Sequence, residues 1–137
     1  MIDIETEVFD RCARAVLGRY PDAFCTSEQV YAPASFPAAC ITESSNTTNL
    51  RMQDNQTEEQ YADVVFTADV YSDLSAGGAA KKQCRDIAGI IDETMAEMGI
   101  RRTFLCMVDN FADSRVCRYT ARFAATVRSD GTIFRRS

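Results

Sequence analysis

The sequence predicts an α+β fold in which two helices cover one face of a mainly antiparallel β-sheet. Residues 61–72 and 115–128 alternate apolar and polar side chains with a period of two, as strands with one buried face do. Residues 76–98 lie between these two segments and repeat apolar residues every three or four positions, which is typical of an amphipathic helix. A helix that can cover the apolar face of a sheet favours a two-layer architecture.

The composition is that of one globular domain, which we expect to span residues 1–137. No apolar run approaches the roughly 20 residues that cross a membrane, and the acidic start lacks the features of a signal peptide. We therefore expect the protein to be made and kept in a cytoplasm, without contact with a membrane.

The formal net charge of −5 divides unevenly along the chain. Residues 1–75 carry 13 acidic and 4 basic groups, a net of −9, and residues 76–137 carry 7 acidic and 11 basic groups, a net of +4. A dipolar surface of this kind suits head-to-tail contact between copies. The overall acidity argues against tight sequence-independent binding of DNA.

The residues that most often perform catalysis or bind metals are missing or scattered. The chain has no histidine, so the most common general base is absent, and its six cysteines form no Cys-x-x-Cys pair. Carboxylate pairs such as Asp92-Glu93 lie where exposed helix faces or loops are expected. The sequence predicts no enzyme, no metal site and no cofactor, and it predicts buried free thiols rather than disulfides.

In the first half, residues 2–18 predict a helix that ends at Gly18, followed by short strands at about 23–31 and 38–44. Residues 43–60 are strongly polar and predict a long hairpin tip or arm. One interpretation is a surface loop. The other is an arm that becomes ordered only on contact with another subunit or a lumen, with Leu50, Arg51 and Met52 as the contacting residues.

In the second half, Gly99 and Ile100 predict a glycine stop for the central helix. Residues 101–109 are apolar on both faces and predict a central strand. The sequence Ser129-Asp130-Gly131-Thr132 predicts a two-residue hairpin loop before a short edge strand at 132–136.

Charged residues alternate with apolar residues on the two long strands. Arg118, Arg122 and Arg128 share one face of the strand at 115–128. On an open face three arginines are ordinary, whereas against another copy they suit forked pairing with carboxylates. Asp63 and Asp69, on the polar face of the strand at 61–72, are the candidate partners, and both interpretations stay open.

The order of these elements resembles the tail terminator proteins of long-tailed bacteriophages, also called tail completion or head–tail joining proteins. The most specific stretches are Asp69-Val70-Tyr71-Ser72 and Arg118-Tyr119-Thr120-Ala121-Arg122-Phe123. The resemblance covers nearly the whole chain, but the family pattern does not require six cysteines or the length of the segment at 43–60, so no role for that segment is carried over.

This resemblance implies a non-enzymatic virion protein that assembles as a hexameric ring at the head–tail junction. The ring would contact the tail tube protein, cap the finished tube and meet a head-side connector protein. DNA would pass through its lumen without being read. Three alternatives remain. One is another neck or minor tail component of the same particle, and another is a cytoplasmic α+β module that binds a ligand or nucleic acid. The third is a metal-dependent enzyme that uses carboxylates alone.

Overall fold

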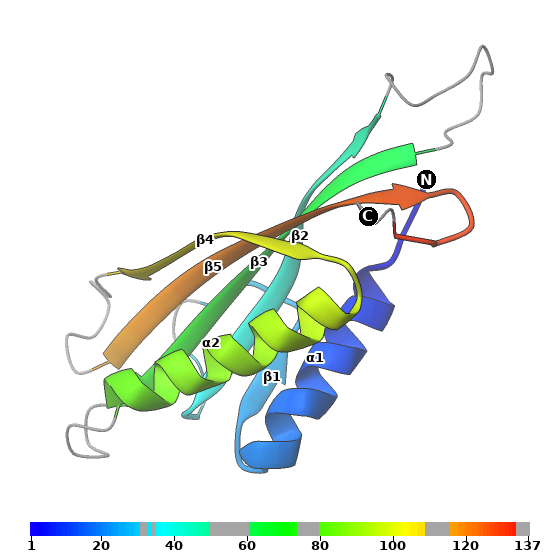
Figure 1. Ribbon diagram of the computed structural model, residues 1–137. Helices are drawn as coiled ribbons and strands as arrows, with labels where there is room; N and C mark the ends of the chain where they lie inside the picture. Colours follow the sequence, from blue (N-terminus) through cyan, green and yellow to red (C-terminus); the bar gives the residue numbers. More distant parts are fainter. Residues whose placement is uncertain (31–32, 34, 50–60, 74–79, 109–115, 134–137) are drawn as a thin grey trace.

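The computed structural model describes residues 1–30, 33, 35–49, 61–73, 80–108 and 116–133 (Figure 1). Within them the elements are, in chain order, α1 (Glu5–Arg19), β1 (Phe24–Thr26), β2 (Ala38–Thr48), β3 (Tyr61–Asp73), α2 (Ala80–Glu97), β4 (Arg101–Val108) and β5 (Val116–Arg128).

The strands form one five-stranded sheet in the order β1-β2-β3-β5-β4. β1 is parallel to β2, and the other neighbours are antiparallel. Both helices pack on one face of this sheet (Figure 1). The predicted α+β class is therefore confirmed, with two helices on one face of a mixed but mostly antiparallel sheet.

The main core lies between this sheet face and the helices. Phe66 of β3 and Phe123 of β5 are directly opposite each other in the register, and both are fully buried. The apolar residues that the sequence places on one side of α2 are all buried as well: Ala80, Cys84, Ile87, Ala88, Ile91, Met95 and Met98. The predicted strand faces and helix stripe are confirmed, because side-chain direction follows the local backbone period.

The end of α2 has the predicted glycine stop. Gly99 has a φ of +87°, its N–H donates to the carbonyl of Ala96 at 3.0 Å, and the N–H of Ile100 donates to that of Met95 at 2.9 Å. This is the Schellman arrangement, in which two unpaired carbonyls of the last turn are satisfied. Ile100 is buried, so the stop also turns the chain directly into β4.

The helix α1 continues through Gly18 to Arg19, so the predicted end at Gly18 is wrong by a residue. Beyond this end, the Tyr20 hydroxyl donates to the Asp86 carboxylate at 2.5 Å, and Arg19 lies 3.4 Å from the same group. These contacts join the end of α1 to the middle of α2.

The polar segment at 43–60 begins as a strand, which corrects the prediction that all of it is a hairpin tip or arm. β2 runs to Thr48 and pairs with β3 as far as Thr48↔Ala62, across an irregularity between Glu43 and Ser45. Backbone pairing does not require apolar side chains, and residues 44–47 are exposed at the sheet margin. Residues 50–60 lie outside the described part of the chain.

The prediction of a central strand at 101–109 is wrong, because β4 is at the edge of the sheet and pairs with β5 alone. Phe104 is 44% exposed and Met107 is 55% exposed. Apolar residues on both faces are compatible with a central strand, but they do not determine strand order.

The hairpin after β5 has three loop residues rather than two. The N–H of Arg128 donates to the carbonyl of Thr132 at 2.8 Å, and Gly131 supplies a φ of +87°. Of the edge strand predicted at 132–136, the described part holds an isolated bridge from Ile133 to Val127, and residues 134–136 lie outside it. Across the described residues, we find no helix whose length and apolar character would let it span a bilayer.

Candidate subunit interface

The sheet face opposite the helices carries most of the charged residues that the sequence singles out. Asp63 and Asp69 of β3 and Arg118, Arg122 and Arg128 of β5 all project from this face, because each lies out of phase with the buried positions. The structure therefore brings the five residues onto one surface. It does not place them in one cluster.

Asp69 is the centre of a buried polar network at one end of this face. Its Oδ1 accepts hydrogen bonds from the Arg118 guanidinium at 2.9 and 3.2 Å and from the Thr120 hydroxyl at 2.6 Å. Its Oδ2 accepts from the Gln29 side chain at 3.3 Å. The Asp69 side chain is 3% exposed, so hydrogen bonds from these donors, rather than from water, must stabilise its negative charge.

A second, smaller apolar cluster covers this end of the face. Ala38, Cys40, Tyr71 and Val116 are buried there against Phe24, Val30 and Phe36. The Arg118 guanidinium also lies over the Tyr71 ring, 5.5 Å from its centre. The Asp69–Arg118 pair is thus part of the subunit's own packing, so this aspartate is not a free partner for another copy.

The other three charges lie where the face is open. Asp63 is exposed and accepts hydrogen bonds from Thr126 at 2.8 Å and Asn49 at 3.2 Å. Arg122 is exposed, and its guanidinium lies 5.7 Å from the centre of the Phe104 ring. Arg128 is exposed at the last position of β5.

Leu50, Arg51 and Met52, the contact residues expected in the polar arm, lie outside the described residues. The structure describes the two chain segments that flank them. The N–H of Asn49 donates to the carbonyl of Tyr61 at 2.9 Å, so these two flanking segments are hydrogen-bonded to each other at the points where the described residues stop and resume.

The two margins of the sheet differ in chemistry. On one margin, β4 presents Arg101 and Arg102 followed by the exposed apolar side chains of Phe104 and Met107. On the other margin, β1 pairs with β2 only from Ala38 to Cys40, so the rest of β2 pairs with β3 on one side and has no strand on its other side among the described residues. This part of β2, residues 41–48, is mainly polar.

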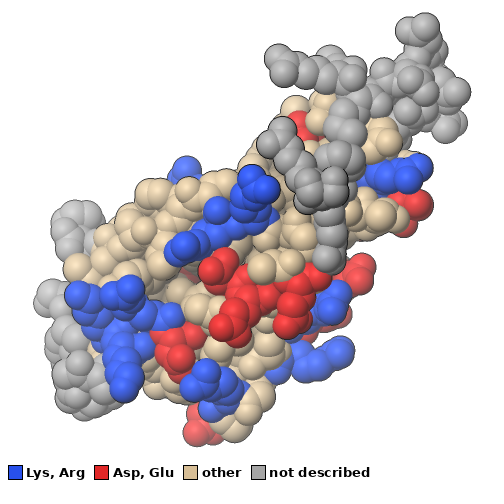
Figure 2. Space-filling model, viewed as in Figure 1, with Lys and Arg blue, Asp and Glu red and all other residues tan. Residues whose placement is uncertain are grey.

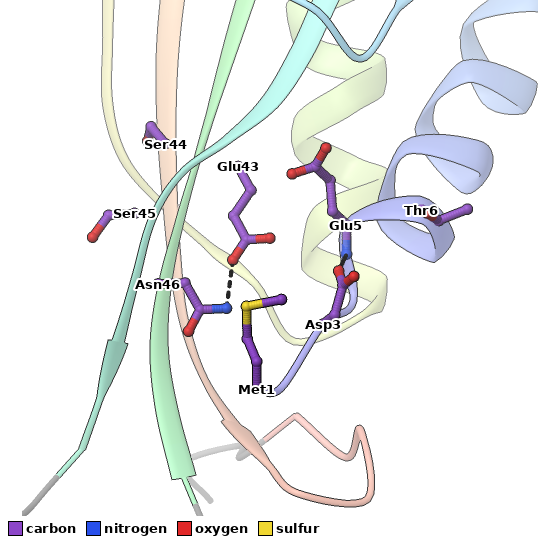
Figure 3. A pocket seen from close by; sticks show the side chains of 8 residues that line it. All are labelled: Met1, Asp3, Glu5, Thr6, Glu43, Ser44, Ser45 and Asn46. Carbon is purple, nitrogen blue, oxygen red and sulfur yellow. Dashed lines mark hydrogen bonds between the residues drawn. The ribbon is translucent and has the colours of Figure 1, made fainter. Parts of the chain in front are cut away.

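An acidic hollow lies beside this second margin, between β2 and the beginning of α1 (Figure 3). Asp3, Glu5 and Glu43 line this space of about 360 Å³. The Asn46 amide bridges the Glu43 carboxylate and the backbone carbonyl of Ile2, at 2.7 Å each. Burial raises the pKa of the Glu43 carboxyl, and the nearby Glu5 and Asp3 raise it further against the effect of the Asn46 hydrogen bond.

The helix side of the molecule is also divided by charge. Figure 2 shows lysine and arginine side chains over the beginning of α2, and aspartate and glutamate side chains in a band over its other end. Lys81, Lys82 and Arg85 are the exposed basic residues at the beginning of α2, and Glu93 and Glu97 are the exposed acidic residues toward its end.

The described residues show no group of three or more cysteine, aspartate or glutamate side chains arranged to hold a metal ion. All six cysteines are free thiols, of which Cys12, Cys40 and Cys84 are buried. Burial raises the pKa of the Cys12 thiol to about 12 and also raises that of Cys84. A thiol that stays protonated is a poor nucleophile and metal ligand.

Sequence reasoning missed the contribution of Gln29 and the exposure of β4. Gln29 comes from an irregular segment about 40 residues before Asp69, so no local period connects the two. For β4, the Arg101-Arg102 pair before the apolar residues was an available signal, because basic residues often protect a sheet edge.

In comparisons with known proteins, no family model matches this chain, and none of the curated proteins matches it.

Proposed function

We propose that this protein is a non-enzymatic structural protein of a bacteriophage virion, and that it forms a ring that caps the tail tube and joins it to the head. The observation that carries the proposal is the difference between the two open margins of its sheet. β4 offers a basic and apolar margin, and β2 with the beginning of α1 offers a polar and acidic one.

Such a pair of margins fits contact between copies. The basic residues Arg101 and Arg102 of one subunit would face the carboxylates of Asp3, Glu5 and Glu43 on the next. The exposed Phe104 and Met107 lie on opposite faces of β4, and both would be covered by a contact that encloses this edge strand. A head-to-tail contact between different surfaces closes into a ring when its rotation permits.

An edge strand that exposes large apolar side chains favours an assembled state. Sheet edges in monomers are usually short, charged or covered, because an unpaired edge recruits other chains. β4 has eight residues and pairs on one side only. Together with the resemblance in element order, this favours a ring-forming tail terminator, with the tail tube protein and a head-side connector protein as its neighbours.

The test is imaging of the purified protein and of tail tubes to which it has been added. Wild-type protein should form closed rings, probed for six subunits by native mass spectrometry, and should stop further growth of the tubes. The variant Phe104→Lys with Met107→Lys should stay folded but lose both properties. Leu17→Lys is the matched control, because Leu17 is a 38%-exposed apolar residue near the end of α1, and the proposed contact uses only the beginning of that helix. A wild-type protein that forms no ring alone or on the tubes would refute the proposal.

A further inference from the structure

The open edges of the sheet, on β4 and on β2, run in opposite directions. The pairings of β4 with β5, of β5 with β3 and of β3 with β2 are all antiparallel, so β4 and β2 are antiparallel to each other. The two strands lie toward opposite margins of the described sheet (Figure 1). In a ring whose axis runs along the strands, β4 of one subunit therefore meets β2 of the next subunit in the antiparallel sense.

The open part of β2 is as long as β4. β2 has 11 residues, and β1 pairs with the first three of them, Ala38 to Cys40. Residues 41–48 remain, and β4 likewise has eight residues. Backbone N–H and C=O groups along an open edge can pair with a strand of another chain. The two edges are therefore matched in direction and in length.

The two arginines at the beginning of β4 lie on opposite faces of the sheet. Arg102 is opposite Phe123, which is buried under the helices, and its Nε lies 3.8 Å from the Asp92 carboxylate of α2. Arg101 is opposite Ala124, on the open face. Side chains alternate between the two faces along a strand, so Arg102 alone is on the helix side.

The acidic hollow beside β2 is on the helix side as well. Glu43 is opposite Phe66 and Asn46 is opposite Val64, and both of these β3 residues are buried in the main core. Figure 3 shows the side chains of Glu43 and Asn46 between β2 and the beginning of α1. The hollow of about 360 Å³ is large enough for a guanidinium, which pairs strongly with carboxylates.

We propose that the subunits of the ring are joined by strand addition. β4 of one subunit pairs antiparallel with residues 41–48 of β2 on the next subunit, and the Arg102 side chain enters the acidic hollow there. This contact rests on the proposed ring, and it specifies which arginine reaches the carboxylates. The sheet then continues from subunit to subunit, with all helices on one side of it.

The position of β1 selects the register of the added strand. Registers that keep each side chain on its own face differ by steps of two paired residues. With Arg102 opposite Glu43, the end of β4 would collide with β1 of the next subunit. The next register, across the irregularity after Glu43, avoids this collision. It places Arg102 opposite Asn46 and Arg101 opposite Thr47.

Strand addition also explains why an edge strand exposes apolar side chains on both faces. Phe104 lies on the open face and Met107 on the helix side of β4. A strand inside a continuous sheet has cross-strand neighbours on each face, so both side chains would be covered. Pairing of β4 with β4 of a second copy would cover them too. That arrangement stops at a dimer and leaves the acidic hollow without an arginine.

The first test traps the register in assembled rings. In the variant Arg101→Cys with Thr47→Cys, a mild oxidant should link most subunits to a neighbour, because directly opposite residues of antiparallel strands are within reach of a disulfide. Peptide mapping separates this link from the native thiols. Arg101→Cys with Asn46→Cys is the matched control and should not be linked, because Asn46 lies on the other face of β2.

The second test examines the backbone of the wild-type protein. Hydrogen exchange of the β4 amides should be at least tenfold slower in wild-type rings than in the variant Phe104→Lys with Met107→Lys, which we expect to remain a separate subunit. The amides of α2 should exchange equally in both, since strand addition does not involve that helix.

The third test compares the two arginines. Arg102→Gln should raise the protein concentration needed for ring formation by about tenfold or more, and Arg101→Gln should raise it much less, because Arg101 does not reach the hollow. Equal effects of the two changes would overturn the proposed contact. Rings in which the β4 amides exchange as fast as in the separate subunit, or in which only the control pair is linked, would also overturn strand addition while the proposed function stands. A wild-type protein that forms no ring would refute both.

Discussion

Asp69 on β3 and Arg118 on β5 are joined at 2.9 Å, although the strand register places Asp69 opposite Thr120 and Arg118 opposite Tyr71. The pair is therefore diagonal across two strands, and the long arginine side chain reaches over Tyr71 to the carboxylate. The aspartate side chain is 3% exposed and the arginine side chain is 20% exposed. The charge of the aspartate therefore depends more on this contact than the charge of the arginine does.

Asp69→Asn should lower the free energy of unfolding by about 2–3 kcal/mol, because it removes a buried charge from a partner that stays partly buried. Asp63→Asn is the matched control on the same strand face, since Asp63 is exposed, and should change stability by less than about 0.5 kcal/mol. Urea unfolding followed by circular dichroism measures both. Equal effects at the two positions would show that the network around Asp69 has no special role.

Ile91→Ala should cost about 2–5 kcal/mol, from lost burial and the cavity that remains. Ile91 is fully buried in the middle of the face of α2 that meets the sheet. Lys82→Ala, on the exposed side of the same helix, should be nearly neutral. The same urea unfolding experiment measures both variants. A loss of less than about 0.5 kcal/mol for Ile91→Ala would contradict the packing of α2 against the sheet.

The Cys12 thiol should make stability fall at alkaline pH. Burial is the main cause of its high pKa, raised from 9.0 to about 12, and Arg11 acts in the opposite direction. The folded protein therefore keeps the proton where the unfolded chain loses it. The resulting stabilisation is complete below pH 9 and is lost as the pH rises from 9 toward 12.

The measurement compares wild type with Cys12→Ala in the presence of a reductant. The stability advantage of wild type should shrink between pH 8 and pH 10.5, roughly the range in which a thiol with an ordinary pKa ionises. An advantage that stays constant over this range would mean that the thiol ionises equally in both states. Cys84→Ala should behave in the same direction, because burial raises the pKa of that thiol too.

Local periodicity was sufficient to predict the faces of β3 and β5, the buried side of α2 and its glycine stop. Side chains of a strand or helix repeat at intervals that depend only on the local backbone. Ile91 could therefore be placed in the core before its neighbours were known. The same reasoning separated Asp69 and Arg118 from the core face, but it could not show that they meet.

Only the tertiary structure decided the strand order and the partners of charged groups. A strand with apolar residues on both faces, such as β4, can be central or can expose those residues at an edge, because its position depends on which other strands pair with it. In the same way, the register of β3 against β5 and the packing of the segment at Gln29 determine that the Asp69 carboxylate is enclosed while Asp63 stays open. The sequence by itself determined which face of each element is apolar, since that is a local property of the chain, whereas contacts between distant segments decided which polar groups are buried and which remain available to a partner.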